Sequence, residues 1–260
     1  MEEKIRQAIA DLLASGEVSG VVALKENIGT VTPCLFSKDD DLSVLRLSPR
    51  YPVAKLVHLL SKEDPDVKLG VVCRGCDERA LIELAKRNQI VLDNIKVIGF
   101  ACDEDTAQEC NCVKPYTSTG ILVGEKLENL ELTDMYEKFK NMSTGEKLAF
   151  WKEQLNKCNK CYGCRNACQL CFCKECELEN PLWVKRGRLP PEFPIYHLIR
   201  AFHLAGKCVG CGECEAACPA GIPLMTLNRL VRDDIKDLFD YVTGEDVEEV
   251  NPLYTKEEYE

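Results

Sequence analysis

The runs CNKCYGCRNAC (residues 158–168) and CVGCGECEAACP (residues 208–219) dominate the second half of the chain. In each run, two-residue spacers separate three cysteines, and a fourth cysteine follows after three more residues. This spacing is typical of loops that wrap three thiolates around one [4Fe–4S] cluster, while the fourth cysteine ligates a neighbouring cluster. Zinc also binds four thiolates, but two complete runs of this form favour iron and sulfur. The sequence therefore predicts two clusters.

The crossed pattern gives each cluster three ligands from one run and one ligand from the other. The first cluster is expected on Cys158, Cys161, Cys164 and Cys218. The second is expected on Cys208, Cys211, Cys214 and Cys168. Gly163, Gly210 and Gly212 would let the two loops approach the clusters closely.

Three further cysteines, Cys171, Cys173 and Cys176, follow the first run at once in the phrase CQLCFCKEC. Gln169 stands where such a run usually carries proline. Three extra thiols beside an iron–sulfur loop predict a third metal centre, whose fourth ligand would come from elsewhere, for example from the N-terminal part. The spacing alone does not separate an iron–sulfur cluster from a structural zinc ion.

The chain has 260 residues and 17 cysteines, an odd number that cannot pair completely in disulfides. A chain of this length can build a core without disulfide staples. We therefore expect a cytoplasmic protein in a reducing compartment, with cysteines serving as metal ligands. No signal peptide and no apolar run long enough for a membrane span is expected. The net charge of −10 makes nucleic acid an unsuitable partner.

Hydrophobic patterning predicts an α/β N-terminal domain. Short apolar runs indicate strands at residues 21–24, 30–36, 69–73, 96–101 and 121–124, and amphipathic stretches indicate helices at residues 1–14, 53–60 and 77–88. Strand, helix and strand over residues 69–101 predict a parallel, right-handed βαβ unit. Further helices are expected at residues 143–156, 194–205 and 223–238.

The cysteine distribution suggests where the domains divide. A gap of 45 residues without cysteine separates Cys112 from Cys158. We expect an α/β domain at residues 1–145 and an α+β dicluster ferredoxin-like domain with an insert at residues 146–232. An acidic tail is expected at residues 233–260. The stretch 231–260 carries eleven acidic and three basic residues, which fits a solvated tail or a docking segment for a basic partner.

The N-terminal cysteines suggest another metal site by their position on the sheet. Cys73 ends one predicted strand, Cys76 opens the next helix with Asp77 as a possible N-cap, and Cys102 follows the next strand. Ligands of open α/β sheets bind at this carboxyl edge, and a helix N-terminus favours the thiolate. Four of five cysteines could bind a [4Fe–4S] cluster, and the favoured set is Cys76, Cys102, Cys110 and Cys112. Buried free thiols are the alternative.

The remaining candidates point to no catalytic site. Cys34 lies within a predicted strand and is expected in the core. His58, His197 and His203 lie on helical stretches without an evident acid–base partner, so each is expected to be a surface or core residue. Neither a dinucleotide-binding G-x-G-x-x-G nor a phosphate-binding loop occurs.

Three phrases carry a resemblance to a known family: CRGCDERAL (residues 73–81), IGFACDEDTAQECNC (residues 98–112) and HLIRAFHLAGKCVGCGECEAACPAGIPL (residues 197–224). With CQLCFCKEC, they resemble the beta subunits of deazaflavin-coenzyme-reducing hydrogenases and formate dehydrogenases, in a version with a dicluster ferredoxin domain. The resemblance implies partner subunits of a hydrogenase, a formate dehydrogenase or a heterodisulfide-reductase-like complex. It also implies a flavin, FAD, although no flavin-binding motif is present, the α/β part is short and the ferredoxin part follows it.

The sequence therefore predicts two main functions and leaves a third as an alternative. The first is a non-catalytic electron-transfer subunit of an anaerobic oxidoreductase complex, relaying electrons through several [4Fe–4S] clusters. Two clusters are assigned, and one or two more are expected. The second is a flavin-bearing beta subunit that itself oxidises or reduces a nicotinamide or deazaflavin cofactor. A zinc-built assembly module, colourless and redox-silent, is a third alternative.

Overall fold

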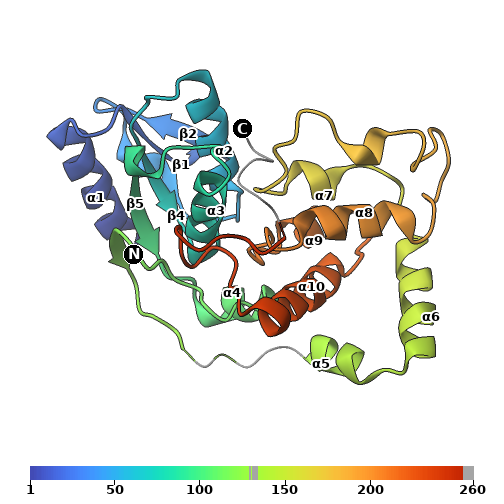
Figure 1. Cartoon of the computed structure of the whole chain (residues 1–260). Helices are drawn as coiled ribbons and strands as arrows, with labels where there is room; N and C mark the ends of the chain where they lie inside the picture. The colour runs from blue at the N-terminus through green and yellow to red at the C-terminus, as the bar shows by residue number, and fades with distance from the viewer. Residues whose placement is uncertain (129, 131–133, 254–260) are drawn as a thin grey trace.

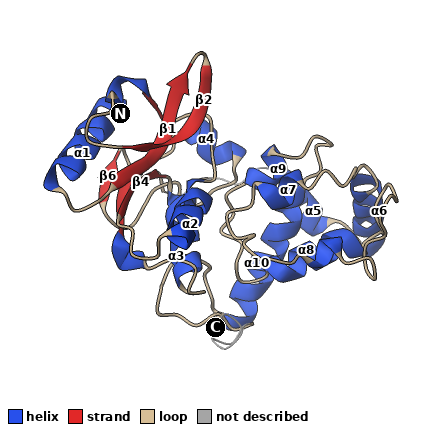
Figure 2. Cartoon of the chain, turned by 90° about the horizontal axis from the view of Figure 1, so that it is seen from above, coloured by secondary structure: helices blue, strands red, loops and turns tan. Residues whose placement is uncertain are grey.

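The computed structural model describes residues 1–128, 130 and 134–253. Strands are confined to the first part of the chain, whereas residues 134–253 form helices and loops (Figure 1, Figure 2). The first part expected from the sequence is therefore confirmed as α/β. The α+β class expected for the second part is wrong for residues 134–253, because its cysteine loops lead into short helices and its remaining elements are helical.

Six strands form one sheet with the order β2-β1-β4-β5-β6, and β3 pairs with β1 outside this path. The strands are β1 (Gly20–Asn27), β2 (Thr30–Phe36), β3 (Leu45–Arg46), β4 (Leu69–Cys73), β5 (Ile95–Phe100) and β6 (Ile121–Val123). The pairs β1–β4, β4–β5 and β5–β6 are parallel, and β1–β2 is an antiparallel hairpin. The predicted parallel βαβ unit is confirmed.

Helices cover the sheet and build the second part. Those of the first part are α1 (Glu2–Ser15), α2 (Val53–Glu63), α3 (Gly75–Ala85) and α4 (Glu104–Glu109). Those of the second part are α5 (Asp134–Asn141), α6 (Thr144–Leu155), α7 (Gly163–Asn166), α8 (Ile195–Leu204), α9 (Glu213–Ala216) and α10 (Leu224–Phe239). The short elements β3, α4 and α5 were not expected, because each is too short to show a clear period.

Alternation along the central strands divides the core into two layers. In β1, Val21 and Ala23 pack with α1, while Val22 and Leu24 point to the opposite face, which α2 and α3 cover. This is the two-residue period of a strand buried on both faces. The layer under α2 and α3 also contains Leu204, so the core continues from the sheet into the second part.

Gln169, which stands where such a cysteine run usually carries proline, makes a second contact between the two parts. The backbone N–H of Ala54, in the first turn of α2, donates a hydrogen bond of 3.1 Å to Gln169 Oε1, and both groups are buried. Gln169 thereby satisfies one of the N–H groups that a helix leaves unpaired at its start. The departure of this run from the ordinary pattern is thus explained by packing between the two parts.

The end of the described chain folds back onto the first part. The expected boundary between residues 232 and 233 falls inside α10, which continues to Phe239. Beyond it, Tyr241, Thr243 and Asn251 are buried. A solvated tail is therefore wrong for this segment, because its side chains and backbone bond to α3 and to the second part. Residues 254–260 of the expected tail lie outside the described residues.

Candidate metal centres

The first ferredoxin site groups the cysteines expected from the crossed pattern. Burial raises the pKa of Cys158, and the nearby thiols of Cys164, Cys161 and Cys218 raise it further. Cys158, Cys164 and Cys218 also pack against one small apolar cluster around Leu155. The short helix α7 turns the chain between Cys161 and Cys168. The four thiols thus lie near one another, although three come from the first cysteine run and Cys218 comes from the second.

The second ferredoxin site is a small cavity of about 20 Å³. All four expected cysteines line it: Cys168, Cys208, Cys211 and Cys214. Asn228 from α10 places its amide nitrogen 3.6 Å from the Cys214 sulfur. Arg200 lines the cavity and donates a hydrogen bond to the carbonyl oxygen of Cys164 in the other site, so one cation lies between the two sites.

Both cysteine loops have the same backbone conformation. Gly210 and Gly212 have φ values of 69° and 77°, and Lys160 and Tyr162, at the equivalent positions of the first loop, have φ values of 53° and 60°. A Cβ atom at position 210 would lie 2.2 Å from Arg232 Nη1, so a larger residue there would have to displace this side chain as well as adopt a left-handed backbone conformation. The two loops carry different residues at these positions, glycines in one and Lys160 and Tyr162 in the other, but their backbones share the same left-handed turns.

The N-terminal site lies at the carboxyl edge of the sheet. Its four favoured cysteines line a cavity of about 10 Å³: Cys76, Cys102, Cys110 and Cys112. Cys76 lies at the start of α3, Cys102 follows β5, and the other two follow α4. Cys73 is fully buried in the apolar core and does not line the cavity, and Cys34 packs against the core under α1.

Burial raises the thiol pKa values at this site. It raises the pKa of Cys76 well above its usual value, and it raises the pKa of Cys102 to about 11. At Cys76, burial therefore opposes the thiolate that the N-terminus of α3 was expected to favour. Asp77 is also not the N-cap: it is the third helical residue, and its carboxylate accepts a hydrogen bond from the Arg74 N–H. Metal binding would have to displace these thiol protons, as it does in other thiolate sites.

Arginines that the sequence did not single out surround this site. Arg50 Nη1 lies 2.7 Å from Cys110 Sγ and 3.3 Å from the carbonyl oxygen of Cys211. Arg79 Nη2 lies 3.7 Å from Cys112 Sγ. The nearby cysteines raise the pKa of both guanidinium groups, against the opposing effect of burial. These cations can offset the negative charge of a thiolate-bound cluster.

The N-terminal site adjoins the second ferredoxin site. Gly210 and Cys211 of the second ferredoxin loop line the same cavity as the four N-terminal cysteines. Arg50 contacts both sites through one nitrogen atom. No sequence signal could have revealed this contact, because Arg50 and Cys211 are 161 residues apart.

The extra cysteines line a separate cavity. Cys171, Cys173 and Cys176 line a cavity of about 520 Å³ beside α8. Cys171 remains close to the second ferredoxin site, because a hydrogen bond from its thiol to Cys168 is the main cause that lowers the pKa of Cys168 below its usual value.

A basic cavity of about 490 Å³ opens beside the N-terminal site. Cys110, Cys112 and Gly210 line it. Five cationic side chains and four carboxylates also line it: Arg79, Lys114, Arg229, Arg232, Lys236, Glu109, Glu215, Asp233 and Glu245. Two of these form an ion pair, with Lys114 Nζ 2.7 Å from Glu245. The cavity therefore offers a polar, slightly cationic space next to candidate cluster ligands.

The donor set of the three sites fits iron–sulfur clusters. Each of the two cavity-lined sites offers four thiols and nearby cationic groups, and among the described residues no carboxylate lines either cavity. Clusters are held by four cysteine thiolates, and their potentials depend on charge and on hydrogen bonds to sulfur.

None of the helices in the described part of the chain is long and apolar enough to cross a membrane.

Comparisons with known proteins agree with the sequence and the geometry. The family profile described as a 4Fe-4S binding domain matches residues 203–223, which contain the second cysteine run. The chain is 26% identical to the F420-dependent formate dehydrogenase subunit beta of Methanocaldococcus jannaschii, over 95% of this chain and 92% of the relative. It is 25% identical to the F420-dependent formate dehydrogenase 1 subunit beta of Methanococcus maripaludis, over 91% of this chain and 89% of the relative. The resemblance expected from the sequence is thus confirmed: the chain carries a 4Fe–4S binding domain and is similar to formate dehydrogenase beta subunits along most of its length.

Proposed function

We propose that this protein is the iron–sulfur electron-transfer subunit of a larger oxidoreductase complex. Its relatives are named as beta subunits of formate dehydrogenases, which supports an assembly with a catalytic subunit of that kind. It would have no substrate of its own. It would act in the reducing cytoplasm, where its cysteines do not form disulfides. Its division into an α/β unit with one site and a dicluster unit with two sites is part of the proposal.

Three [4Fe–4S] clusters are assigned to the three sites. The first ferredoxin cluster is held by Cys158, Cys161, Cys164 and Cys218. The second is held by Cys168, Cys208, Cys211 and Cys214. The N-terminal cluster is held by Cys76, Cys102, Cys110 and Cys112. Bound clusters of this type take up and release single electrons.

One observation carries the proposal: Gly210 and Cys211 line the N-terminal cavity together with its four cysteines. The second ferredoxin site is therefore a neighbour of both other sites, since Arg200 connects it to the first and Arg50 connects it to the third. Three adjacent sites in one chain would form a path for electrons between the α/β part and the second part. The protein's own contribution is to hold the sites together and to surround them with cations.

The basic cavity favours a second candidate function, the oxidation or reduction of a flavin or deazaflavin cofactor. Its volume of about 490 Å³ suits a small organic ligand. Its lining includes Cys110 and Cys112 of the N-terminal site, so a ligand there would lie beside a cluster. The names of the relatives as F420-dependent enzymes support a deazaflavin in this alternative.

An anaerobic redox titration of the full chain separates the two functions. If the protein is a relay, dithionite should reduce it with about three electrons or more, one per cluster, and acid precipitation should release no flavin. The visible absorbance around the iron–sulfur bands and the fluorescence of the acid supernatant are the two readouts. Release of stoichiometric FAD would instead support the flavin-bearing enzyme, and a colourless, redox-silent protein would contradict both.

A further inference from the structure

Five cysteines remain after the three clusters are assigned, and three of them share one cavity. Cys171, Cys173 and Cys176 line the space of about 520 Å³ between the extra cysteine run and α8. The cavity is distinct from those of the second ferredoxin site and the N-terminal site, and far larger than either. Three thiols on one cavity form an incomplete set of ligands for a metal centre, which needs a fourth group.

The cavity lining offers two other side chains that commonly bind metals, His203 and Glu179. Glu179 forms an ion pair with Arg165, and a carboxylate is not among the usual ligands of an iron–sulfur cluster. His203 lies near the end of α8, exposed to solvent. An imidazole nitrogen can replace a cysteine on the iron of a cluster, as it does in Rieske centres. His203 is therefore the side chain that can complete the set.

The four groups do not form a ready site for a single ion. A zinc site needs four ligands within about 2.3 Å of one point. Among the residues that the structure describes, no three His, Cys, Asp or Glu side chains are placed to hold one metal ion. The same is true of the eight ferredoxin cysteines, whose sequence spacing is typical of [4Fe–4S] clusters. The extra cysteines thus share this feature with the ferredoxin cysteines.

The charge around the cavity suits an anionic cluster. Five cationic side chains line it: Lys55, Arg165, Lys174, Arg200 and Lys207. Glu179 is the one carboxylate in the lining. Arg200 also lines the second ferredoxin site, so one guanidinium group lies between the two places. The Cys171 thiol is hydrogen-bonded to Cys168, which brings the cavity next to an assigned cluster ligand.

We propose that Cys171, Cys173, Cys176 and His203 hold a fourth [4Fe–4S] cluster, with His203 as its nitrogen ligand. This inference rests on the proposed function and extends its relay. Cys173 and His203 are exposed, so this cluster would lie at the surface, where electrons can enter or leave toward a partner subunit. The neutral imidazole would also make the cluster less negative and raise its reduction potential relative to an all-cysteine cluster.

Iron and acid-labile sulfide counts on the anaerobically purified full chain test the site. The parent protein should contain about 16 iron atoms, and Cys173→Ala should contain about 12. Cys34→Ala is the matched control, since Cys34 lies on β2 and packs against the core under α1. It should keep the parent count. A parent count of about 12 that Cys173→Ala leaves unchanged would overturn the fourth cluster but leave the three-cluster relay intact, whereas a count of eight or fewer would overturn the relay as well.

His203→Cys tests the nitrogen ligand separately. This variant should keep about 16 iron atoms, because cysteine can take the same place, while the potential of one cluster falls and the others stay unchanged. An EPR-monitored redox titration measures those potentials. Identical titrations of His203→Cys and the parent would exclude His203 as a ligand. Stoichiometric zinc in the parent that Cys173→Ala loses would overturn the cluster in favour of a zinc site.

Discussion

The Cys110→Ala variant should lose about four iron atoms per chain and keep those of the ferredoxin sites. Cys110 is one of four cysteines around the N-terminal cavity, and its sulfur lies 2.7 Å from Arg50 Nη1. Without this thiol the cluster would have three protein ligands, and the Arg50 guanidinium would lose its anionic partner. Iron and sulfide analysis of the anaerobic protein measures the loss.

Cys73→Ala is the matched control for this variant. Cys73 precedes Cys76 by three residues, but it is fully buried in the apolar core and does not line the cavity. Its removal should cost some stability through a small cavity in the core and leave the iron content unchanged. The opposite pattern, with iron lost from Cys73→Ala and retained in Cys110→Ala, would show that the ligand set has been assigned wrongly.

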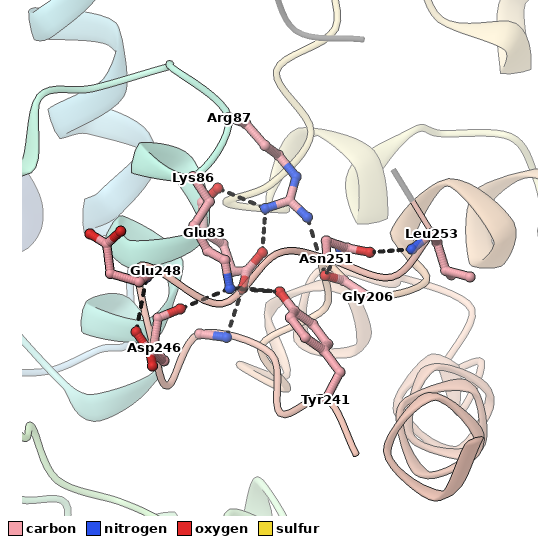
Figure 3. Close-up of polar contacts among 10 residues, drawn as sticks. Glu83, Lys86, Arg87, Gly206, Tyr241, Asp246, Glu248, Asn251 and Leu253 are labelled. Atoms are coloured by element: carbon pink, nitrogen blue, oxygen red, sulfur yellow. Dashed lines mark hydrogen bonds and ion pairs between the residues drawn. The ribbon is translucent and has the colours of Figure 1, made fainter. Parts of the chain in front are cut away.

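Glu83→Ala should lower the free energy of unfolding by about 3–5 kcal/mol, because it leaves buried charge uncompensated. Glu83 is fully buried on α3 and forms an ion pair with Arg87. The hydroxyl group of Tyr241 and the N–H of Gly244 also donate to Glu83 Oε1, at 2.9 and 2.8 Å. Figure 3 shows that the Glu83 carboxylate bonds to residues of both α3 and the folded-back C-terminal segment.

The same network reaches the second part of the molecule. Arg87 Nη2 and Asn251 Nδ2 both donate to the carbonyl oxygen of Gly206, at 3.2 and 2.6 Å, and Lys86 Nζ donates to the carbonyl oxygen of Asp246 (Figure 3). Gly206 lies two residues before Cys208, the start of the second cysteine run. Loss of Glu83 should therefore loosen the contact between the two parts as well as α3 itself.

Thermal unfolding monitored by circular dichroism under anaerobic conditions checks this prediction. For a chain of this size, the apparent melting temperature of Glu83→Ala should fall by roughly 10 °C. Glu153→Ala is the control, because Glu153 is exposed on α6 and its ion pair with Lys157 is long, at 3.9 Å. It should change stability by less than about 1 kcal/mol. Equal shifts in the two variants would contradict the structural role given to Glu83.

Much of this fold could be predicted because its signals are local. The strands at residues 69–73 and 95–100 are short apolar runs, and the helices α1, α6, α8 and α10 show clear caps or amphipathic stripes, so each was expected within a few residues. The packing of the C-terminal segment was not expected. Its acidic composition resembles a solvated tail, and only the tertiary contacts of Tyr241 and Asn251 with the rest of the chain show that it is packed.

The candidate sites likewise combine residues that local sequence signals predict with residues that only tertiary contacts bring there. Motif spacing predicts the ferredoxin cysteines, and positions at the start of a helix and after a strand predict Cys76 and Cys102 as ligands. Arg50 and Arg79 could not be identified, because their contacts with Cys110 and Cys112 depend on how distant segments fold together. His203 was set aside for the same reason: no motif links it to the extra cysteines, and only the cavity beside α8 brings them together.

The iron content of the wild-type full chain, purified without oxygen, tests the central claim most directly. A relay that extends from the ferredoxin sites into the α/β part requires at least three clusters, and so about 12 iron atoms and an equal amount of acid-labile sulfide per chain, or about 16 with the fourth cluster. A value near eight, with both ferredoxin clusters present and the N-terminal cysteines free, would contradict this account.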